Sequence, residues 1–205
     1  TTQGEWKCPG HGTPVEKNGR HYLLYHAYHV KGSVYTGRQA LLQEFKFTED
    51  GWLEFQADPS QPDDRIPTTV QDDFAAGDTL SPLWQWPVFD TLHASVENGV
   101  LTLQGAEGKT GAFIGQKITT TDFEAETTIV PVHSDAESGL ALFGDENNLI
   151  CASYVNGLVR VWKIEAGREI LVKEKRIKPD NLFLRMKVRF RPDGSVLFSY
   201  STGGK

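Results

Sequence analysis

Four short segments near the start of the chain decide its fold: Cys8-Pro9-Gly10-His11-Gly12-Thr13-Pro14-Val15, His21-Tyr22-Leu23-Leu24-Tyr25-His26-Ala27-Tyr28, Gly37-Arg38-Gln39-Ala40-Leu41-Leu42-Gln43-Glu44-Phe45 and Asp50-Gly51-Trp52. Glycine and proline recur among them, and aromatic and aliphatic residues are frequent within them, as is typical of strands joined by tight turns. A single small sheet of this kind can neither bury both faces nor close its edges alone. We therefore predict that further β-structure packs against this small sheet and covers its faces and edges.

The text downstream of residue 72 predicts an all-β domain. Short apolar and β-branched runs recur about every ten residues, a spacing typical of a β-sandwich. We expect strands at 100–104, 112–118, 123–130, 139–143, 149–155, 158–164, 169–173, 183–190 and 195–200. No window has a sustained helical period.

Turn residues separate these runs. Asn156-Gly157 is the strongest hairpin signal, because both central residues of a type I′ turn need a positive φ. Further turns are expected at Glu97-Asn98-Gly99, Asp145–Asn148, Ala166-Gly167 and Pro192-Asp193-Gly194.

Composition limits the classes of partner. The chain has 205 residues, 39% of them hydrophobic, and a net charge of −6. An acidic balance disfavours nucleic acid as a partner. No stretch approaches the roughly 20 apolar residues of a membrane span, so we expect no membrane partner either.

The basic stretch ending at Arg191 is read as the outer face of a strand. From Leu184 to Phe190, charged and apolar residues alternate, which places the charges toward solvent and the apolar set in the core. The two cysteines, Cys8 and Cys151, match no metal-binding spacing, and we interpret both as small buried apolar residues.

The segments over residues 8–52 resemble the final blade of glycoside hydrolase family 43, the five-bladed β-propeller enzymes that cleave xylosides and arabinosides. Asp72-Asp73-Phe74, Leu80–Trp86 and Ser138–Asn148 resemble the concanavalin-like antiparallel β-sandwich that follows the propeller in many of these enzymes. The resemblance implies an all-β chain: a final propeller blade at 1–55, a proline-rich linker at 56–71 and a sandwich at 72–205, truncated at its C-terminus.

The resemblance also implies an activity that this chain holds only in part. Inverting glycoside hydrolysis needs one carboxylic acid and one carboxylate base. In the family these groups lie in earlier blades, so we assign no catalytic residue here and expect the chain alone to be inactive. The implied partners are an oligo- or polysaccharide substrate and the upstream blades, in the same protein or as a separate chain. Secretion to the periplasm or outside is expected by analogy.

Three residues of the blade are candidates for substrate binding. His11, in Pro-Gly-His-Gly, matches a family histidine that points to the propeller axis and touches a central calcium ion directly or through water. Calcium prefers oxygen ligands, so waters would be needed. The alternative interpretation of His11 is a histidine that is hydrogen-bonded in a turn. Arg38 matches an arginine that contacts substrate hydroxyls and the catalytic acid, although an exposed arginine in a loop is the alternative interpretation. His26 shares its strand face with Tyr28, and either packing or the pocket explains it. No organic cofactor is implied.

Trp84 and Trp86 leave three interpretations open. Two residues apart, they would share one strand face, and they could pack between sandwich and propeller, fill the sandwich core, or stack on a sugar ring. Asp73 is a candidate calcium ligand, although a turn at the start of a strand explains it equally well. The competing class of protein is a non-catalytic, lectin-like carbohydrate-binding sandwich.

Overall fold

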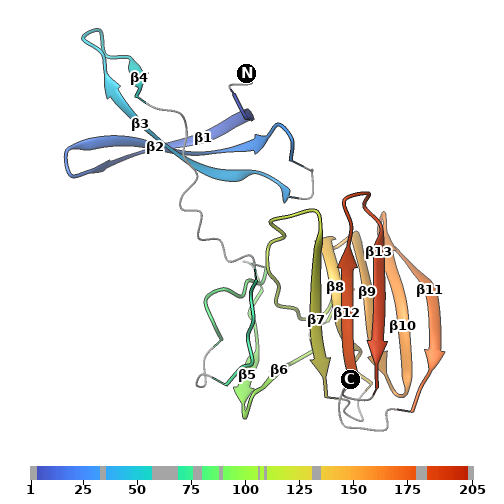
Figure 1. Ribbon diagram of the computed structural model, residues 1–205. Coiled ribbons are helices and arrows are strands. Elements are labelled where there is room, and N and C mark those ends of the chain that lie inside the picture. The colour runs from blue at the N-terminus through green and yellow to red at the C-terminus, as the bar shows by residue number, and fades with distance from the viewer. Residues whose placement is uncertain are drawn as a thin grey trace. The chain divides into compact units, whose positions relative to one another are not determined.

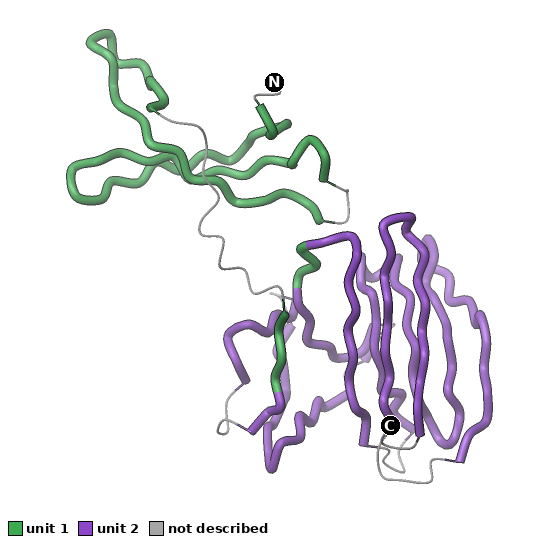
Figure 2. Tube along the Cα trace, viewed as in Figure 1, with its two compact units in different colours: residues 1–72, 117–119 green, residues 73–116, 120–205 purple. Residues whose placement is uncertain are grey.

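The computed structural model describes residues 4–32, 36–56, 69–75, 80–87, 90–105, 107–108, 110–130, 135–178 and 184–202. These residues contain thirteen strands and no helix, which confirms the all-β prediction (Figure 1). The chain divides into two compact units, residues 1–72 with 117–119 and residues 73–116 with 120–205 (Figure 2). The prolines expected to form a linker, Pro59, Pro62 and Pro67, lie outside the described residues.

The first unit is one four-stranded antiparallel sheet. Its strands follow the chain in order, β1 (Trp6–Lys17), β2 (Arg20–His29), β3 (Gln39–Phe47) and β4 (Leu53–Phe55). Asn18 and Gly19, both at positive φ, make the turn between β1 and β2. Aromatic rings from neighbouring strands meet on one face, where Phe45 lies 5.4 Å from Phe47 and 6.4 Å from Phe55 between ring centroids.

The second unit holds the other nine strands. A hairpin comprises β5 (Ala94–Glu97) and β6 (Val100–Leu103), and the remaining strands form two sheets, ordered β11-β10-β9-β8 and β13-β12-β7. Their bounds are β7 (Phe123–Ile129), β8 (Ser138–Asp145), β9 (Asn148–Val155), β10 (Leu158–Glu165), β11 (Arg168–Arg176), β12 (Leu184–Phe190) and β13 (Val196–Ser201).

The two larger sheets of this unit form a sandwich around an apolar core, and Leu149, Cys151 and Ile164 form a second buried cluster. Ala152, Tyr154 and Val159 of the first sheet pack with Met186 of the second, and Phe198 and Ile129 join them at the margin. Met186 is only 1% exposed and Val188 is fully buried. This layer keeps water from the inner faces of both sheets, which is the dominant stabilising contribution in such a domain.

The hairpin predictions are confirmed. Asn156 and Gly157 have φ of 46° and 83°, and Asn98-Gly99 and Ala166-Gly167 show the same pair of positive values. The register of the flanking strands follows directly, with Val155 opposite Leu158 across the Asn156-Gly157 turn. Because side chains alternate, the turn decides which residues of β9 and β10 enter the core.

The alternation read in β12 is also confirmed. Arg185, Lys187 and Arg189 lie opposite Thr128, Glu126 and Glu124 of β7 and form ion pairs with acidic residues on the outer face. Their apolar neighbours Met186, Val188 and Phe190 are buried.

Two predictions were wrong. The strand expected over 112–118 is absent; these residues form a loop that makes only an isolated bridge, between Gly115 and Gln85. Four glycines and a run of three threonines lie at 105–121, and glycine weakens strands. Cys8 is exposed rather than buried, because its φ of 53° lies at a shift in the register of β1.

Candidate functional site

The candidate site lies on the β1–β2 hairpin and the start of β3 in the first unit. Strand β1 is irregular there, with register shifts between Lys7 and Gly10 and between Gly10 and Thr13. His11, inside this irregular segment, has a φ of 53°. A non-glycine residue in the left-handed region is strained by about 1 kcal/mol or more, so the local fold holds His11 in a conformation that a regular strand would not adopt.

The irregular segment brings two histidines together. Gly10 lies opposite His26 in the register of β1 and β2, and a side chain at Gly10 would begin 3.4 Å from Nε2 of His26. The rings of His11 and His26 are 5.4 Å apart at an interplanar angle of 33°. A Cβ at position 10 would make ordinary van der Waals contact with the imidazole of His26, so the meeting of the two rings follows from the register of β1 and β2.

Arg38 completes the cluster. Its guanidinium carbon lies 5.3 Å from the ring centroid of Tyr28, a cation–π arrangement, and Tyr28 shares the face of His26 on β2. The aromatic face orients a side chain that is otherwise exposed. The sequence singled out His11, His26 and Arg38 separately, and the structure places them in one group, which we call the cationic cluster.

The electrostatics of the cationic cluster appear in the pKa of His26. That pKa is lowered from its usual value of 6.5, first by burial, then by the electrostatic effects of Arg38 and His11. The guanidinium of Arg38 is always charged, so it disfavours a further positive charge on His26. The planar fork of donors on Arg38 has the geometry that suits paired carboxylate oxygens.

The side chains of the cationic cluster supply no oxygen ligand for a calcium ion, so waters would have to complete such a site. The cluster offers imidazole nitrogens and a guanidinium, whereas calcium takes oxygen ligands. Among the described residues no group of three or more His, Cys, Asp or Glu side chains could hold a metal. Oδ1 of Asp73, in the second unit, accepts a hydrogen bond of 3.0 Å from the backbone of Ala75, as expected of a turn. These contacts do not test calcium binding, so a calcium ion at His11 through water, or at Asp73, stays a prediction.

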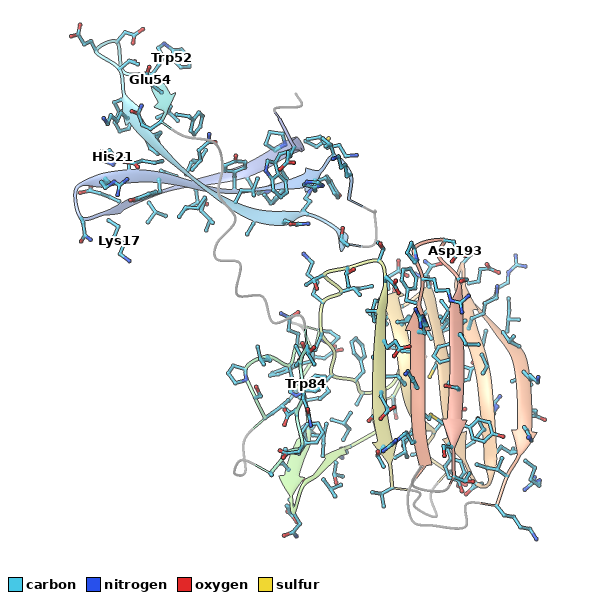
Figure 3. All side chains as sticks on the ribbon, in the orientation of Figure 1. Lys17, His21, Trp52, Glu54, Trp84 and Asp193 are labelled. Carbon is cyan, nitrogen blue, oxygen red and sulfur yellow. The ribbon has the colours of Figure 1, made fainter. Side chains whose placement is uncertain are left out.

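Trp84 and Trp86 precede the strands of the second unit in the chain, and Figure 3 labels Trp84. Trp84 is half-buried, with its ring stacked on Phe74 at 6.1 Å and 25°. Trp86 is 44% exposed. The residue between them, Gln85, forms an isolated bridge with Gly115 rather than part of a strand, so the two indoles have different environments within this unit.

A polar network on β9 and β10 was not anticipated from the sequence. Nε1 of Trp162 donates to Oγ of Ser153 (2.9 Å), Ser153 donates to Glu137 (2.6 Å), and Arg160 contacts the same carboxylate at 3.2 Å. Ser153 is 1% exposed. The available signal was one serine in an otherwise apolar strand, Leu149–Val155, which by itself says nothing of its partners.

Comparison with protein families gives a match that coincides closely with the second unit of the chain. Residues 71–205 match the family model described as the β-xylosidase C-terminal concanavalin A-like domain, GH43_C2. The chain belongs to this family. No curated protein sequence matches it.

Similar solved structures extend over both units. The GH43 BlXynB protein of Bacillus licheniformis matches 100% of this chain with a TM-score of 0.73 and 22% identity, over 44% of its own length. The xylan β-1,4-xylosidase of Bacillus halodurans C-125 matches 99% of this chain with a TM-score of 0.70 and 20% identity, over 45% of its length. The GH43B protein of the Bacteroides ovatus xyloglucan locus matches 96% of this chain with a TM-score of 0.65 and 17% identity, over 46% of its own length.

At these identities the structures establish a shared fold. The chain spans less than half the length of each of these three structures. Within the described residues, no helix is long and apolar enough to cross a membrane.

Proposed function

We propose that this chain is the C-terminal portion of an inverting glycoside hydrolase acting on β-xylosides or α-L-arabinofuranosides of plant polysaccharides. Family membership over 71–205 and a fold shared with a xylan β-1,4-xylosidase support the class of protein. Another similar structure is a GH43 glycoside hydrolase whose active site was engineered to display both endo-xylanase and exo-arabinofuranosidase activity, so a related enzyme can be made to act on both kinds of sugar. The observation that carries the proposal is the cationic cluster.

In this proposal the four-stranded first unit is the final blade of a β-propeller. Large apolar side chains stand exposed on it: Phe47 is 59% and Trp52 74% exposed. Figure 3 labels Trp52 beside the outer strand β4. Leu53 and Phe55 of the outer strand β4 are 43% and 42% exposed. Exposed apolar groups in such number favour contact with further protein, which the neighbouring blades of a propeller would supply.

The cationic cluster would then serve carboxylates contributed by those blades. Inversion requires a protonated acid and a carboxylate base on opposite faces of the sugar. The rigid fork of donors on Arg38 suits paired oxygens, and its charge would lower the pKa of a nearby carboxylate. His11 and His26 would offer ring nitrogens to sugar hydroxyls. The upstream blades would belong to the same protein or form a separate chain, in an exported enzyme.

The first test is hydrolysis of aryl β-xyloside and aryl α-L-arabinofuranoside. The 205-residue chain alone should show no activity. Measurable turnover by it would refute the proposal that the catalytic carboxylates lie in the upstream blades. Intact mass spectrometry of the protein from its natural source shows whether the blades form a second polypeptide. Adding the upstream segment of the whole protein should restore hydrolysis.

In the restored enzyme, Arg38→Ala should reduce kcat/KM by about 10²-fold, because a lost positioning contact misplaces the substrate. The matched control Lys46→Ala removes a cation from strand β3, outside the cationic cluster, and should leave kcat/KM within about twofold of the unmodified enzyme.

A second candidate function is a lectin-like carbohydrate-binding sandwich. The exposed ring of Trp86 favours it, because an indole face can stack on a sugar ring. Retention of the chain on insoluble xylan or arabinan, lost in Trp86→Ala and kept in Trp52→Ala, would support it. No retention of the unmodified chain would exclude this role.

A further inference from the structure

Strand β11 (Arg168–Arg176) forms one edge of the four-stranded sheet of the sandwich unit (Figure 1). Its only strand partner in the described part of the chain is β10. All nine of its residues are exposed. The backbone groups on its outer side are therefore available to a further strand.

The centre of this edge is apolar. Ile170, Leu171 and Val172 are 37%, 47% and 56% exposed and lie consecutively on the strand. Charged residues flank them on both sides, Arg168 and Glu169 before and Lys173 to Arg176 after. An apolar centre with a charged rim is the composition of a small interface.

Charges and a bulge on an edge strand normally discourage pairing with arbitrary strands. Here both are present, with the register shift between Val161 and Trp162 leaving Val172 as the extra residue. The order of the charges, however, is self-complementary. Two copies of β11 paired antiparallel about Leu171 would place Arg168 opposite Glu174 and Glu169 opposite Lys173, with Ile170 opposite Val172.

Neighbouring registers lose this match. Pairing about Val172 would set Arg168 against Arg176 and the apolar Ile170 against Glu174. Pairing about Ile170 would set Glu169 against Leu171. Opposed like charges and charge–apolar pairs are unfavourable across a sheet, so the register centred on Leu171 is selected.

We propose that β11 is a homodimerisation edge, at which a second copy of this chain adds antiparallel about a two-fold axis through Leu171 and joins the two β11-β10-β9-β8 sheets into one. Among the other edge strands of the two sheets, β13 (Val196–Ser201) contains no charged residue and selects no such register. The contact is isologous, so it closes at two copies.

Charge reversal provides the test. Sedimentation equilibrium of the 205-residue chain should show a monomer–dimer equilibrium weakened by salt. Glu169→Lys or Lys173→Glu alone should raise the Kd about tenfold or more, because each replaces two attractive pairs per dimer with two repulsive ones. An equimolar mixture of the two variants restores both pairs, so it should form a heterodimer with a Kd close to that of the unmodified chain.

Lys175→Glu is the matched control, because Lys175 faces Gly167 in the proposed register and Glu169 only in the register centred on Val172. It should leave the Kd within about twofold. Circular dichroism spectra of all variants confirm that they remain folded.

Cross-linking checks the axis independently of affinity. In a Cys8→Ser background, Leu171→Cys should form an intermolecular disulfide under mild oxidation, since directly opposed residues lie within disulfide reach. Lys175→Cys should not, being far from its own copy. A chain that stays monomeric up to about 1 mM, where a Kd of that size would already give extensive dimer, would overturn the proposal. A dimer indifferent to the charge reversals would also overturn it.

Discussion

Nε1 of Trp162 donates a 2.9 Å hydrogen bond to Oγ of Ser153, which in turn donates to Glu137 at 2.6 Å. The serine hydroxyl thus connects an indole on β10 to a carboxylate that precedes β8. It does so where Ser153 is only 1% exposed. A buried hydroxyl that serves two partners contributes more to stability than an exposed one, because its loss leaves both partners incompletely hydrogen-bonded.

Ser153→Ala should therefore lower the free energy of unfolding by about 1–3 kcal/mol. Chemical denaturation measures the change. Ser199→Ala, at an exposed position of β13, is the control and should change stability by no more than about 0.5 kcal/mol. Equal effects of the two substitutions would contradict the network's role.

Gly139→Ala should destabilise the sandwich by about 1–3 kcal/mol or more, because a Cβ there would lie 2.1 Å from the backbone oxygen of Ala152 and the backbone cannot yield as a side chain would. A Cβ at Gly105 would meet nothing within 4 Å, and that residue has no positive φ. Gly105→Ala should accordingly be neutral or slightly stabilising. Thermal unfolding of the two variants compares them directly, and a stable Gly139→Ala protein would show that β8 and β9 are further apart than described.

Neutralising Arg38 should raise the pKa of His26. Burial is the largest cause of the lowered pKa and stays, but the second cause, the charge of Arg38, is removed in Arg38→Gln. NMR titration of the imidazole Cε1 proton should show the pKa moving toward 6.5, whereas Lys46→Gln should leave it unchanged. If the pKa of His26 did not change in Arg38→Gln, the charge of Arg38 would not act on His26, and Arg38 would not belong to the cationic cluster.

The lowered pKa of His26 also makes the free energy of unfolding depend on pH. Because the pKa of His26 is lower in the folded state, the unfolded state binds more protons, and stability falls as the pH decreases from about 6.5 through the folded pKa. The loss of stability is complete once the pH lies below the pKa of His26 in the folded state. This loss should be smaller in Arg38→Gln. Denaturation at a series of pH values measures it.

The two cysteines should differ in reactivity. Burial raises the pKa of Cys151 to about 12, so its reactive thiolate is scarce at neutral pH, whereas Cys8 is exposed. A thiol reagent at pH 8 should label one cysteine in the native chain and both after denaturation. Cys8→Ser should abolish native labelling, and rapid labelling of native Cys8→Ser would show that Cys151 is accessible.

Much of the fold was predictable because its signals are local. Asn156-Gly157 and Ala166-Gly167 adopt the positive φ values that their residue types favour. The alternation over β12 places Met186 and Val188 in the core because strand side chains alternate by geometry. The loop at 112–118 was mistaken for a strand because apolar content alone does not supply a hydrogen-bonding neighbour.

The candidate site was only partly predictable. His11, His26 and Arg38 could each be identified by type and motif, but their grouping depends on the irregular pairing of β1 with β2. The exposure of Cys8 follows from that same irregularity. The Trp162–Ser153–Glu137 network brings together residues up to 25 positions apart, which no short motif encodes.

By itself the sequence determined the β class, the turns and the alternation of faces, because each depends on the conformational preferences of neighbouring residues. Tertiary structure alone decided which histidines meet, which serine is buried and which strand, β11, is left at an edge. These depend on contacts between residues distant in the chain, and such contacts form only when hydrophobic burial brings the sheets together and fixes their register.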